Sequence, residues 1–222
     1  MNQKKYKHII WDWNGTLLDD VNYCLNTINS LLEEYQYSKI DLEKYLDIFT
    51  FPVKEYYESL GIDFTKHSFE FISTRFIELY EKNRNQIKIF PDTRDSLKLV
   101  NNLEIKQSIL SAYTDKNLKE IIEEQNLTDN FEYIHGIDNI YASGKMSAAR
   151  TLLTKLNISS NNILIIGDTL HDYYIAKEFN TDCVLISQGH NSKERLISSG
   201  TTVIESLIDL KPLLTRSCLK ST

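Results

Sequence analysis

A short apolar run near the amino terminus ends abruptly in a carboxylate. Residues 8–11 read His-Ile-Ile-Trp, and Asp12 and a polar turn that contains Gly15 follow them. An apolar run of this length, bounded by turn residues, is typical of a buried β-strand, which places Asp12 at the carboxyl end of that strand. Ligands of open α/β sheets bind at this end. Asp12 is therefore either a solvated strand terminus or a reactive group, and the rest of the chain decides between the two.

Strand and helix patterns alternate through the second part of the chain. After a return into the core over residues 87–93, short apolar runs favour strands at residues 106–111, 131–135, 162–167, 182–187 and 202–204. Helical spacing of apolar residues favours helices at residues 96–103, 115–125, 146–156, 170–179, 192–199 and 204–210. This alternation predicts an α/β fold with a doubly wound parallel, Rossmann-like sheet and helices on both faces. The polar tail after Pro212 is expected to be frayed.

The segment directly behind the first strand has only helical patterns. Apolar spacing predicts helices at residues 21–35, 42–49, 53–60 and 68–80, and we expect no strand between residues 19 and 84. Asp19 or Asp20 is a candidate cap for the first of these helices, and Gly61 ends the third. We therefore predict a Rossmann-like core domain, residues 1–18 and 87–222, and a small helical cap domain, residues 19–86, inserted after the first strand.

Composition and charge argue against several classes of protein. The chain has 222 residues and a net charge of −6, so nothing favours nucleic acid or an anionic membrane surface as a partner. The apolar run after the basic start Met1–Lys5 is too short for a signal peptide, and no run is long enough to span a bilayer. The scattered cysteines Cys24, Cys183 and Cys218 form no CxxC pair. They disfavour a disulfide framework or a zinc site and fit a reducing cytoplasm, so we expect a cytoplasmic monomer or homodimer.

Polar groups gather where several of the predicted strands end. They are Asp12, Asn14 and Thr16, then Ser111 and Ala112, then Lys145 in a later loop, then Asp168 and Asp172. The carboxyl ends of parallel strands lie along one edge of a sheet, so these groups are expected to share a site. Each signal alone is weak, since a lone strand-end aspartate or loop lysine is usually solvated. Their conjunction in this order favours the shared site.

This set of side chains suits phosphoryl transfer. Hard carboxylate oxygens bind Mg²⁺, which bridges to a phosphate group. Asp12 is a candidate to attack phosphorus directly, while the metal and Lys145 neutralise the charge that keeps carboxylate and phosphate apart. Ser111 and the amides after it are candidates to hold phosphate oxygens at a helix start.

The same motifs resemble the four ordered motifs of the haloacid dehalogenase-like hydrolase superfamily, and the helical segment is similar to that superfamily's cap. The motifs are Asp12-Trp13-Asn14-Gly15-Thr16-Leu17, Leu110-Ser111-Ala112, Lys145, and Gly167-Asp168-Thr169-Leu170-His171-Asp172. The likeness spans nearly the whole chain, and the phosphoglycolate phosphatase-like members are the subgroup it most resembles. It implies a magnesium-dependent phosphohydrolase that acts on a small phosphorylated metabolite through an aspartyl-phosphate intermediate.

The resemblance also implies a role for each residue. Asp12 is implied as the nucleophile, and Lys145 steadies it and the phosphate. The implied metal ligands are Asp12, Asn14, Asp168 and Asp172, with Asn14 acting through its backbone carbonyl. The implied phosphate-binding residues are Thr16, Ser111, Ala112 and Lys145, and Thr16 also braces the loop.

Asn14 departs from the pattern of the family's phosphatases, which usually carry a second aspartate at this position. That aspartate protonates the leaving oxygen and then activates water, a contribution typically worth about 10²–10⁴-fold. An amide cannot exchange this proton. We therefore expect slower turnover of alkyl phosphates, or a bias to acyl phosphates or pyrophosphate. His171, Asp19 and Asp20 are alternative acids, although helix-start and cap roles are favoured for them.

Other functions stay open. A dehalogenase needs an aspartate nucleophile but no metal, which would leave Asp168 and Asp172 unexplained. Phosphonate cleavage needs a cap lysine, for which Lys54 is a candidate without further support. A phosphomutase is disfavoured because it depends on the proton shuttle that Asn14 lacks. A catalytically weak phosphate-binding or regulatory protein would keep the phosphate site, and Asn14 gives that alternative weight.

The predicted cap and one further strand end give weaker signals. The cap aromatics are expected to be mostly the core of a small helical bundle. The cap lysines are expected to be solvated rather than to bind substrate, namely Lys39, Lys44, Lys54 and Lys66. His190 lies just after another predicted strand, where lining the cleft and serving as a plain turn residue are about equally favoured.

Overall fold

The computed structural model describes residues 6–142 and 144–216, so the basic start at residues 1–5 and Cys218 lie outside the described residues. The strands of the main sheet are β1 (His8–Trp11), β4 (Lys106–Thr114), β5 (Tyr133–Ile137), β6 (Ile163–Gly167), β7 (Asp182–Ile186) and β8 (Thr202–Ile204). Their order across the sheet is β5-β4-β1-β6-β7-β8, and each neighbouring pair is parallel. The predicted parallel sheet is confirmed.

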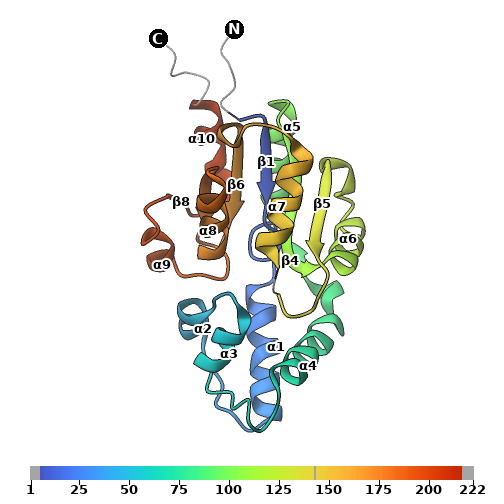
Figure 1. The fold of residues 1–222 in the computed structure, drawn as a ribbon, viewed down its shortest axis with the longest axis vertical. Helices are drawn as coiled ribbons and strands as arrows, with labels where there is room; N and C mark the ends of the chain where they lie inside the picture. Colours follow the sequence, from blue (N-terminus) through green and yellow to red (C-terminus); the bar gives the residue numbers. More distant parts are fainter. Residues whose placement is uncertain (1–5, 143, 217–222) are drawn as a thin grey trace.

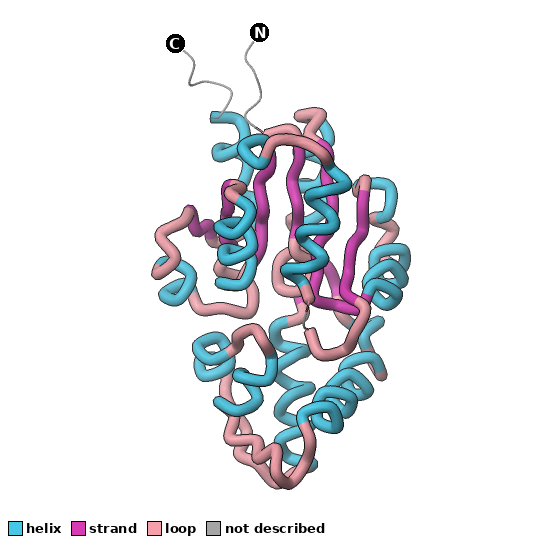
Figure 2. Tube along the Cα trace, in the orientation of Figure 1, coloured by secondary structure: helices cyan, strands magenta, loops and turns pink. Residues whose placement is uncertain are grey.

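Helices pack on both faces of this sheet (Figures 1 and 2). They are α5 (Thr93–Asn102), α6 (Asp115–Glu124), α7 (Lys145–Leu156), α8 (Leu170–Phe179), α9 (Lys193–Ile197) and α10 (Leu210–Arg216). Ile9 and Trp11 of β1 belong to the core cluster that includes side chains of α5, α6 and α10, whereas Ile10 belongs to the cluster of α7 and α8. Successive side chains of a strand point to opposite faces, so a strand covered on both sides requires the continuous apolar run seen here.

A helical insert, which we define as α1 to α4, lies beyond the carboxyl ends of the sheet strands (Figure 1). Its helices are α1 (Val21–Glu34), α2 (Leu42–Ile48), α3 (Val53–Ser59) and α4 (Phe69–Glu81). The chain enters and leaves it through an antiparallel pair of short strands, β2 (Leu18–Asp19) and β3 (Lys88–Ile89). The pair was not predicted. Residues 87–93 return to the core as expected, with Ile87 and Thr93 buried, but through β3 and not through a strand of the main sheet. Strands of two residues are too short to show the alternation of apolar and polar residues from which a strand is predicted.

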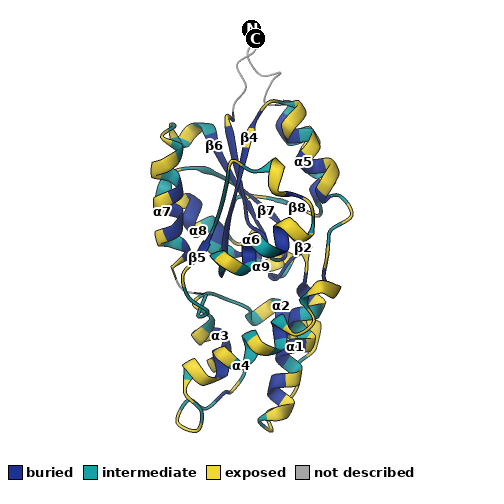
Figure 3. Ribbon diagram, turned by 90° about the vertical axis from the view of Figure 1, so that its right-hand side faces the viewer, coloured by how far each residue is buried: buried dark blue, intermediate teal, exposed yellow. Residues whose placement is uncertain are grey.

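The insert has its own buried side chains. Buried residues of α1 recur three or four positions apart at Cys24, Ile28, Leu31 and Leu32. This spacing is the one that predicted the helix. They belong to one apolar cluster with Tyr45 of α2, Tyr56 of α3 and Ile72 of α4. Figure 3 colours the insert helices by burial, with buried parts dark blue and exposed parts yellow. No helix of the described chain is long and apolar enough to cross a bilayer.

The carboxyl-terminal segment differs from the prediction. We expected a helix over residues 204–210 and a frayed tail after Pro212, but α10 runs over Leu210–Arg216 and follows a short 3-10 turn at Leu207–Asp209. Leu210 and Leu214 lie one helical turn apart and are both buried against the core. Pro212 is tolerated because it lies in the first turn, where a helix does not need its missing N–H. Three further 3-10 turns are described at Arg84–Gln86, Thr128–Asn130 and Ser160–Asn162.

Candidate active site

The candidate site lies where the strand order reverses, at the carboxyl end of β1 between β4 and β6. Trp11, the last residue of β1, is in register with Ile109 of β4 and Ile166 of β6. Asp12 is the next residue, and its backbone N–H donates to the Ile166 carbonyl at 2.8 Å. A reversal of strand order opens a crevice at this edge, into which neighbouring strand ends project their side chains.

Three carboxylates meet in this crevice. One oxygen each of Asp12, Asp168 and Asp172 lies within 4.8 Å of the other two, and all three residues are buried. The Lys145 ammonium donates to Asp12 Oδ1 at 2.5 Å and to Asp172 Oδ1 at 2.6 Å. Lys145 is the first residue of α7 and only 3% exposed. The structure thus brings together four of the predicted site residues around one ammonium group.

The electrostatics of these groups follow from burial and proximity. Burial raises the pKa of Asp12 well above its ordinary value, and the neighbouring carboxylates add to this shift while Lys145 opposes it. Burial also raises the pKa of Asp168. For Asp172, burial acts in the same direction, but the charge and hydrogen bond of Lys145 outweigh it and hold its pKa below the ordinary value. Ionising the whole cluster is therefore unfavourable without additional positive charge.

The donor set fits a hard divalent cation. When ionised, the three carboxylates carry three negative charges against the single ammonium of Lys145, so a divalent cation would balance the cluster. The donors are carboxylate oxygens with no sulfur or imidazole among them, which is the ligand type that Mg²⁺ prefers. Asp12, Asp168 and Asp172 are the residues that would hold it.

Two glycines allow the backbone to pack against Asp168. Gly15 has a φ of +71°, and a Cβ built there would lie 2.2 Å from Asp168 Oδ2. A Cβ on Gly189 would also lie 2.2 Å from that oxygen. The Thr16 hydroxyl donates to Asp168 Oδ1 at 3.1 Å and the His190 N–H donates to Oδ2 at 2.6 Å. Asp168 is therefore held on both carboxylate oxygens by loops from two different strand ends.

The segment predicted to bind phosphate belongs to a longer strand than expected. The pattern predicts a strand end at residue 111, but β4 continues to Thr114, and its register with β5 shifts between Leu110 and Thr114. Ser111 and Ala112 lie in this irregular part and line the cavity at the site. The Ser111 hydroxyl oxygen accepts a bond from the Tyr113 N–H at 3.1 Å. The irregular register leaves this backbone partly free of ladder bonding.

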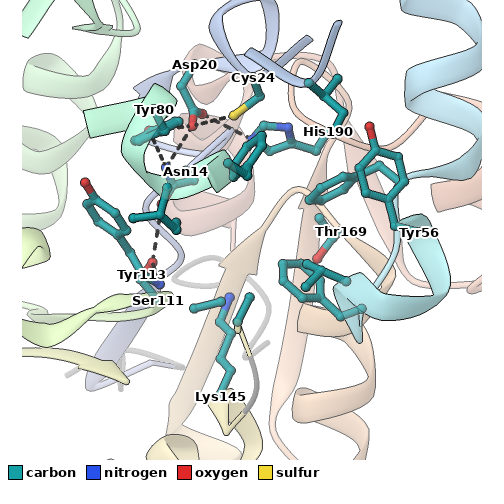
Figure 4. Close-up of a pocket in the computed structure, with 18 of the residues that line it drawn as sticks. Asn14, Asp20, Cys24, Tyr56, Tyr80, Ser111, Tyr113, Lys145, Thr169 and His190 are labelled. Atoms are coloured by element: carbon teal, nitrogen blue, oxygen red, sulfur yellow. Dashed lines mark hydrogen bonds and ion pairs between the residues drawn. The ribbon is translucent and has the colours of Figure 1, made fainter. Parts of the chain in front are cut away.

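Asp20 forms a buried hydrogen-bond centre beside the predicted nucleophile loop (Figure 4). Its Oδ2 accepts from Asn14 Nδ2 at 2.8 Å and from the Tyr80 hydroxyl at 3.0 Å, and its Oδ1 accepts from the Gly15 N–H at 2.8 Å. It is the residue before α1, but its side chain makes no capping hydrogen bond to that helix. Asp20 is therefore the N-cap residue of α1, as one of the two predicted candidates, but its side-chain oxygens bond Asn14, Gly15 and Tyr80 and not the helix end.

His190 completes this network. Its Nε2 lies 3.1 Å from Asp20 Oδ1, and its Nδ1 lies 2.8 Å from the Tyr45 hydroxyl. Burial lowers the pKa of His190, but the Asp20 carboxylate outweighs burial and raises it to about 9. Burial alone would raise the pKa of Asp20, yet His190 and the neighbouring donors hold it below the ordinary value. The two residues therefore form a buried ion pair at neutral pH.

This ion pair predicts a pH dependence of stability. The His190 pKa is raised from 6.5 to about 9, so the contribution is complete below pH 6.5 and is lost as the pH rises through about 9. At about 1.4 kcal/mol per pKa unit, the free energy of unfolding should fall by up to roughly 3 kcal/mol across this window. Urea denaturation in the presence of a chelator measures it. A His190→Gln control should lack the fall, and equal slopes for the two proteins would contradict the assignment.

A cavity of about 130 Å³ opens from this site toward the helical insert (Figure 4). Asp12, Ser111 and Lys145 line its core side. Aromatic side chains of the insert line the other side: Tyr45, Phe49, Phe51, Tyr56, Tyr57 and Phe76. The insert is held over the cavity by two core side chains, because Asn191 Nδ2 and Arg195 Nη1 both donate to the Phe49 carbonyl, at 2.8 and 2.7 Å.

Comparison with known proteins decides the family. A family model described as haloacid dehalogenase-like hydrolase matches residues 9–186. This chain belongs to the haloacid dehalogenase-like hydrolase family. The matched range begins in β1 and ends with β7, so it contains the site residues described above except Gly189, His190, Asn191 and Arg195, which follow it. The predicted family and the prediction of a hydrolase are confirmed.

Named relatives and solved structures of the family resemble this hydrolase along most of its length. Phosphoglycolate phosphatase 1 of Pseudomonas aeruginosa is 22% identical over 214 residues, which cover 92% of this chain and 78% of that protein. Phosphoglycolate phosphatase of Aliivibrio fischeri is 21% identical, covering 89% and 91%. A predicted phosphatase from Clostridium acetobutylicum superposes with a TM-score of 0.82 at 18% identity, covering 95% and 99%. A haloacid dehalogenase-like family protein from Streptococcus pneumoniae gives 0.79 at 18% identity, covering 95% and 99%.

Within this hydrolase, Thr16 and His171 lie differently from the other candidates. Thr16 is fully buried, contacts Asp168 and does not line the cavity, which fits the bracing role rather than direct phosphate contact. The ring centroids of His171 and Phe51 are 4.9 Å apart, and the Nδ1 atom of His171 is buried without a hydrogen-bond partner. Burial lowers the pKa of His171 to about 4, so its imidazole is neutral and holds no extra proton to donate at neutral pH.

Several residues of the hydrolase site were not predicted from the sequence. Tyr45 and Tyr80 sit on insert helices where they resemble ordinary core aromatics, and Thr169 donates to Asp172 Oδ2 at 2.7 Å. His190 was left undecided between lining and turn roles, and it lines the cavity. The cap lysines were expected to be solvated, and all four are exposed in the structure: Lys39, Lys44, Lys54 and Lys66.

Proposed function

We propose that this protein is a magnesium-dependent phosphohydrolase that cleaves a small phosphorylated metabolite through an aspartyl-phosphate on Asp12. The observation that carries the proposal is the position of the Lys145 ammonium between Asp12 and Asp172, beside Asp168 and at the floor of a cavity. This arrangement collects a nucleophile, a fixed cation and a set of metal-type oxygens at one point, as phosphoryl transfer requires. The similarity to phosphoglycolate phosphatases supports a phosphate ester as substrate.

In the first step, a carboxylate oxygen of Asp12 attacks phosphorus. A new bond forms from phosphorus to Asp12, and the bond from phosphorus to the leaving oxygen breaks, with its electron pair going to that oxygen. Lys145 orients Asp12 and neutralises part of the charge that develops, and Ser111 and Ala112 face the phosphoryl group. Asp12, Asp168 and Asp172 would hold Mg²⁺, which would supply the further positive charge that lets an anionic nucleophile approach an anionic phosphate.

In the second step, a water oxygen attacks phosphorus of the aspartyl-phosphate, the bond to Asp12 breaks, and inorganic phosphate leaves. Asn14 cannot supply a proton to the leaving oxygen or take one from this water. Its amide Nδ2 instead donates to Asp20 and to Tyr80, at 2.8 and 3.0 Å. Solvent must then exchange these protons. Acyl phosphates release a carboxylate that is stable as an anion, so they should turn over faster than alkyl phosphates, whose alkoxide leaving group needs a proton.

We propose the helical insert as a cap domain for this site. It supplies one wall of the cavity, and the bonds of Asn191 and Arg195 to Phe49 hold it against the core. A cap that closes over the phosphoryl group excludes competing water during the first step. Lys54 is exposed and does not line the cavity, so the structure gives no support to a Schiff-base lysine and phosphonate cleavage.

A direct assay tests the proposed reaction. With Mg²⁺ the protein should hydrolyse acetyl phosphate and p-nitrophenyl phosphate, and EDTA should abolish the activity. An Asp168→Asn variant should weaken Mg²⁺ binding about 10-fold or more in a calorimetric titration, because it removes one charged ligand. A Thr128→Ser change on the far side of the core is the matched control and should bind Mg²⁺ like the wild type.

Two results would redirect the proposal. Mg²⁺-independent turnover of a halogenated acid would favour a dehalogenase. Binding of inorganic phosphate without turnover of any ester, even an acyl phosphate, would favour the phosphate-binding or regulatory alternative that Asn14 suggests.

A further inference from the structure

The cavity between the site and the helical insert offers an apolar surface of limited size. Its volume of about 130 Å³ is close to the roughly 150 Å³ of a cavity lined by aliphatic and aromatic side chains that binds benzene. The insert contributes aromatic rings to it, and Ile28, Val53 and Ile77 add aliphatic surface. This volume includes the space beside Asp12 and Ser111 that a phosphoryl group would fill, so the remaining part, which is lined by apolar side chains, holds a group no larger than about one ring.

The cationic groups on this lining are already paired. Among the described residues that line the cavity, the cationic side chains are Lys145 and His190. Lys145 is bonded to two carboxylates, and His190 is bonded to Asp20 and to the Tyr45 hydroxyl. The insert lysines are exposed and do not line the cavity. A second anionic group of a substrate would therefore be buried without a counter-charge, and it would lie in a cavity that also holds the Asp20 carboxylate.

Most of the tyrosine hydroxyl groups around the cavity already form hydrogen bonds within the protein. Tyr45 bonds His190 at 2.8 Å, Tyr80 bonds Asp20 at 3.0 Å, and Tyr113 bonds Glu81. The hydroxyl of Tyr56 is buried without a hydrogen-bond partner, so it is not exposed to the cavity. What these residues present to a ligand is the surface of their rings, which favours stacking and dispersion over hydrogen bonding.

We propose that the leaving group of the substrate is uncharged and apolar, no larger than about one aromatic ring, and packs against Phe49, Tyr56 and Val53. The inference rests on the proposed phosphatase function, and it narrows the substrates to esters or acyl phosphates that carry no anionic group besides the phosphate. It separates this protein from the relatives named phosphoglycolate phosphatase, because phosphoglycolate carries a carboxylate next to its phosphate. Such a carboxylate finds no free cation in this cavity.

Phosphonates test the inference by binding alone, because their P–C bond is not hydrolysed and the reactivity of a leaving group does not enter the measurement. Calorimetry of the full chain with Mg²⁺ should show benzylphosphonate binding at least about 10-fold more tightly than methylphosphonate, since a ring in an apolar pocket adds this much. Phosphonoacetate, which carries the second negative charge, should bind no more tightly than methylphosphonate. Equal affinities for the three compounds, a preference for phosphonoacetate, or no binding of benzylphosphonate would each overturn the inference.

Variants at the start of α3 make the test specific to the cavity wall. Val53→Arg places a cation at a half-buried lining position and should reverse the order, so that phosphonoacetate binds more tightly than benzylphosphonate. Val53→Met changes the size without the charge and should keep the wild-type order. Lys54→Met, at the neighbouring exposed position, should leave all three affinities unchanged. An unchanged order in Val53→Arg would overturn the inference.

Hydrolysis separates failure of this inference from failure of the proposed reaction. Benzyl phosphate and 2-phosphoglycolate both release an alkyl alcohol, so their kcat/KM values compare the fit of the leaving group; we expect at least about a 10-fold preference for benzyl phosphate. Turnover with a preference for 2-phosphoglycolate overturns the inference and leaves the phosphatase proposal intact. Phosphonate selectivity without any ester hydrolysis overturns the phosphatase proposal, and the inference then stands only as a description of the binding site.

Discussion

An Asp12→Asn variant is expected to lose phosphate-ester hydrolysis by about 10⁴-fold or more. The amide cannot form the bond to phosphorus, and removal of a nucleophile costs rates of this order. The measurement is kcat for acetyl phosphate with saturating Mg²⁺, with mass spectrometry to detect the covalent phosphoryl adduct in the wild type and its absence in the variant. Hydrolysis that survives at more than a small fraction of the wild-type rate would remove Asp12 from the role of nucleophile.

The same variant should remain folded, which makes its inactivity informative. The pKa of Asp12 is raised by burial and by the adjacent carboxylates, so the ionised side chain is disfavoured in the folded protein. Replacing it with a neutral amide of the same shape removes repulsion with Asp168 and Asp172, while Lys145 keeps its bond to Asp172 at 2.6 Å. The midpoint of thermal unfolding in EDTA should therefore not fall. A clear drop in this midpoint would show that Asp12 is needed for the fold as well.

The second large effect is expected from exchanging Asn14 and Asp20. A double variant, Asn14→Asp with Asp20→Asn, should hydrolyse alkyl phosphates faster than the wild type by about 10²-fold or more, because a general acid enters the position that lacks one. The exchange preserves the hydrogen bond between the two side chains, with the amide of residue 20 as the new donor to residue 14. The measurement is kcat for an alkyl phosphate alongside kcat for acetyl phosphate, which should change far less.

The single variants show why the exchange is needed. In Asn14→Asp alone, two carboxylates would face each other across the 2.8 Å contact that now joins Asn14 Nδ2 to Asp20 Oδ2. Such a pair shares a proton or separates, so we expect a smaller gain in rate than in the double variant. Asp20→Asn alone should give no gain in alkyl-phosphate hydrolysis. If the double variant is no faster than the wild type, another group already supplies the proton.

The Asp20 network gives a structural reason for tolerating Asn14. Asp20 is ionised and paired with His190. The neighbouring position 14 is therefore best filled by a side chain that donates a hydrogen bond to Asp20, as Asn14 does. An amide donates where a second carboxylate would repel. Because Asp20 has a lowered pKa, it is a poor general acid itself, which weighs against it as the alternative proton source considered from the sequence.

Much of the fold could be predicted from the chain because its signals are local. The continuous apolar run of β1 reflects burial on both faces, and the helical spacing of α1 reflects one buried stripe. The ends of elements were less accurate where tertiary contacts set them. The α10 helix continues past the predicted end at residue 210, because Leu210 and Leu214 are buried against the core. The β2–β3 pair depends on contact between residues about 70 positions apart.

By itself, the sequence determined the parallel sheet, the family, and the set of strand-end residues that includes Asp12, Lys145 and Asp168, because each lies in a local motif whose order along the chain fixes its place on the sheet edge. Only the tertiary structure decided that Asp20 and His190 form a buried pair beside Asn14. It alone also decided that the insert turns aromatic rings rather than its lysines toward the cavity. Both outcomes depend on which faces of elements far apart in the sequence meet in the folded protein. A local sequence pattern does not determine which face of a helix or loop meets another element.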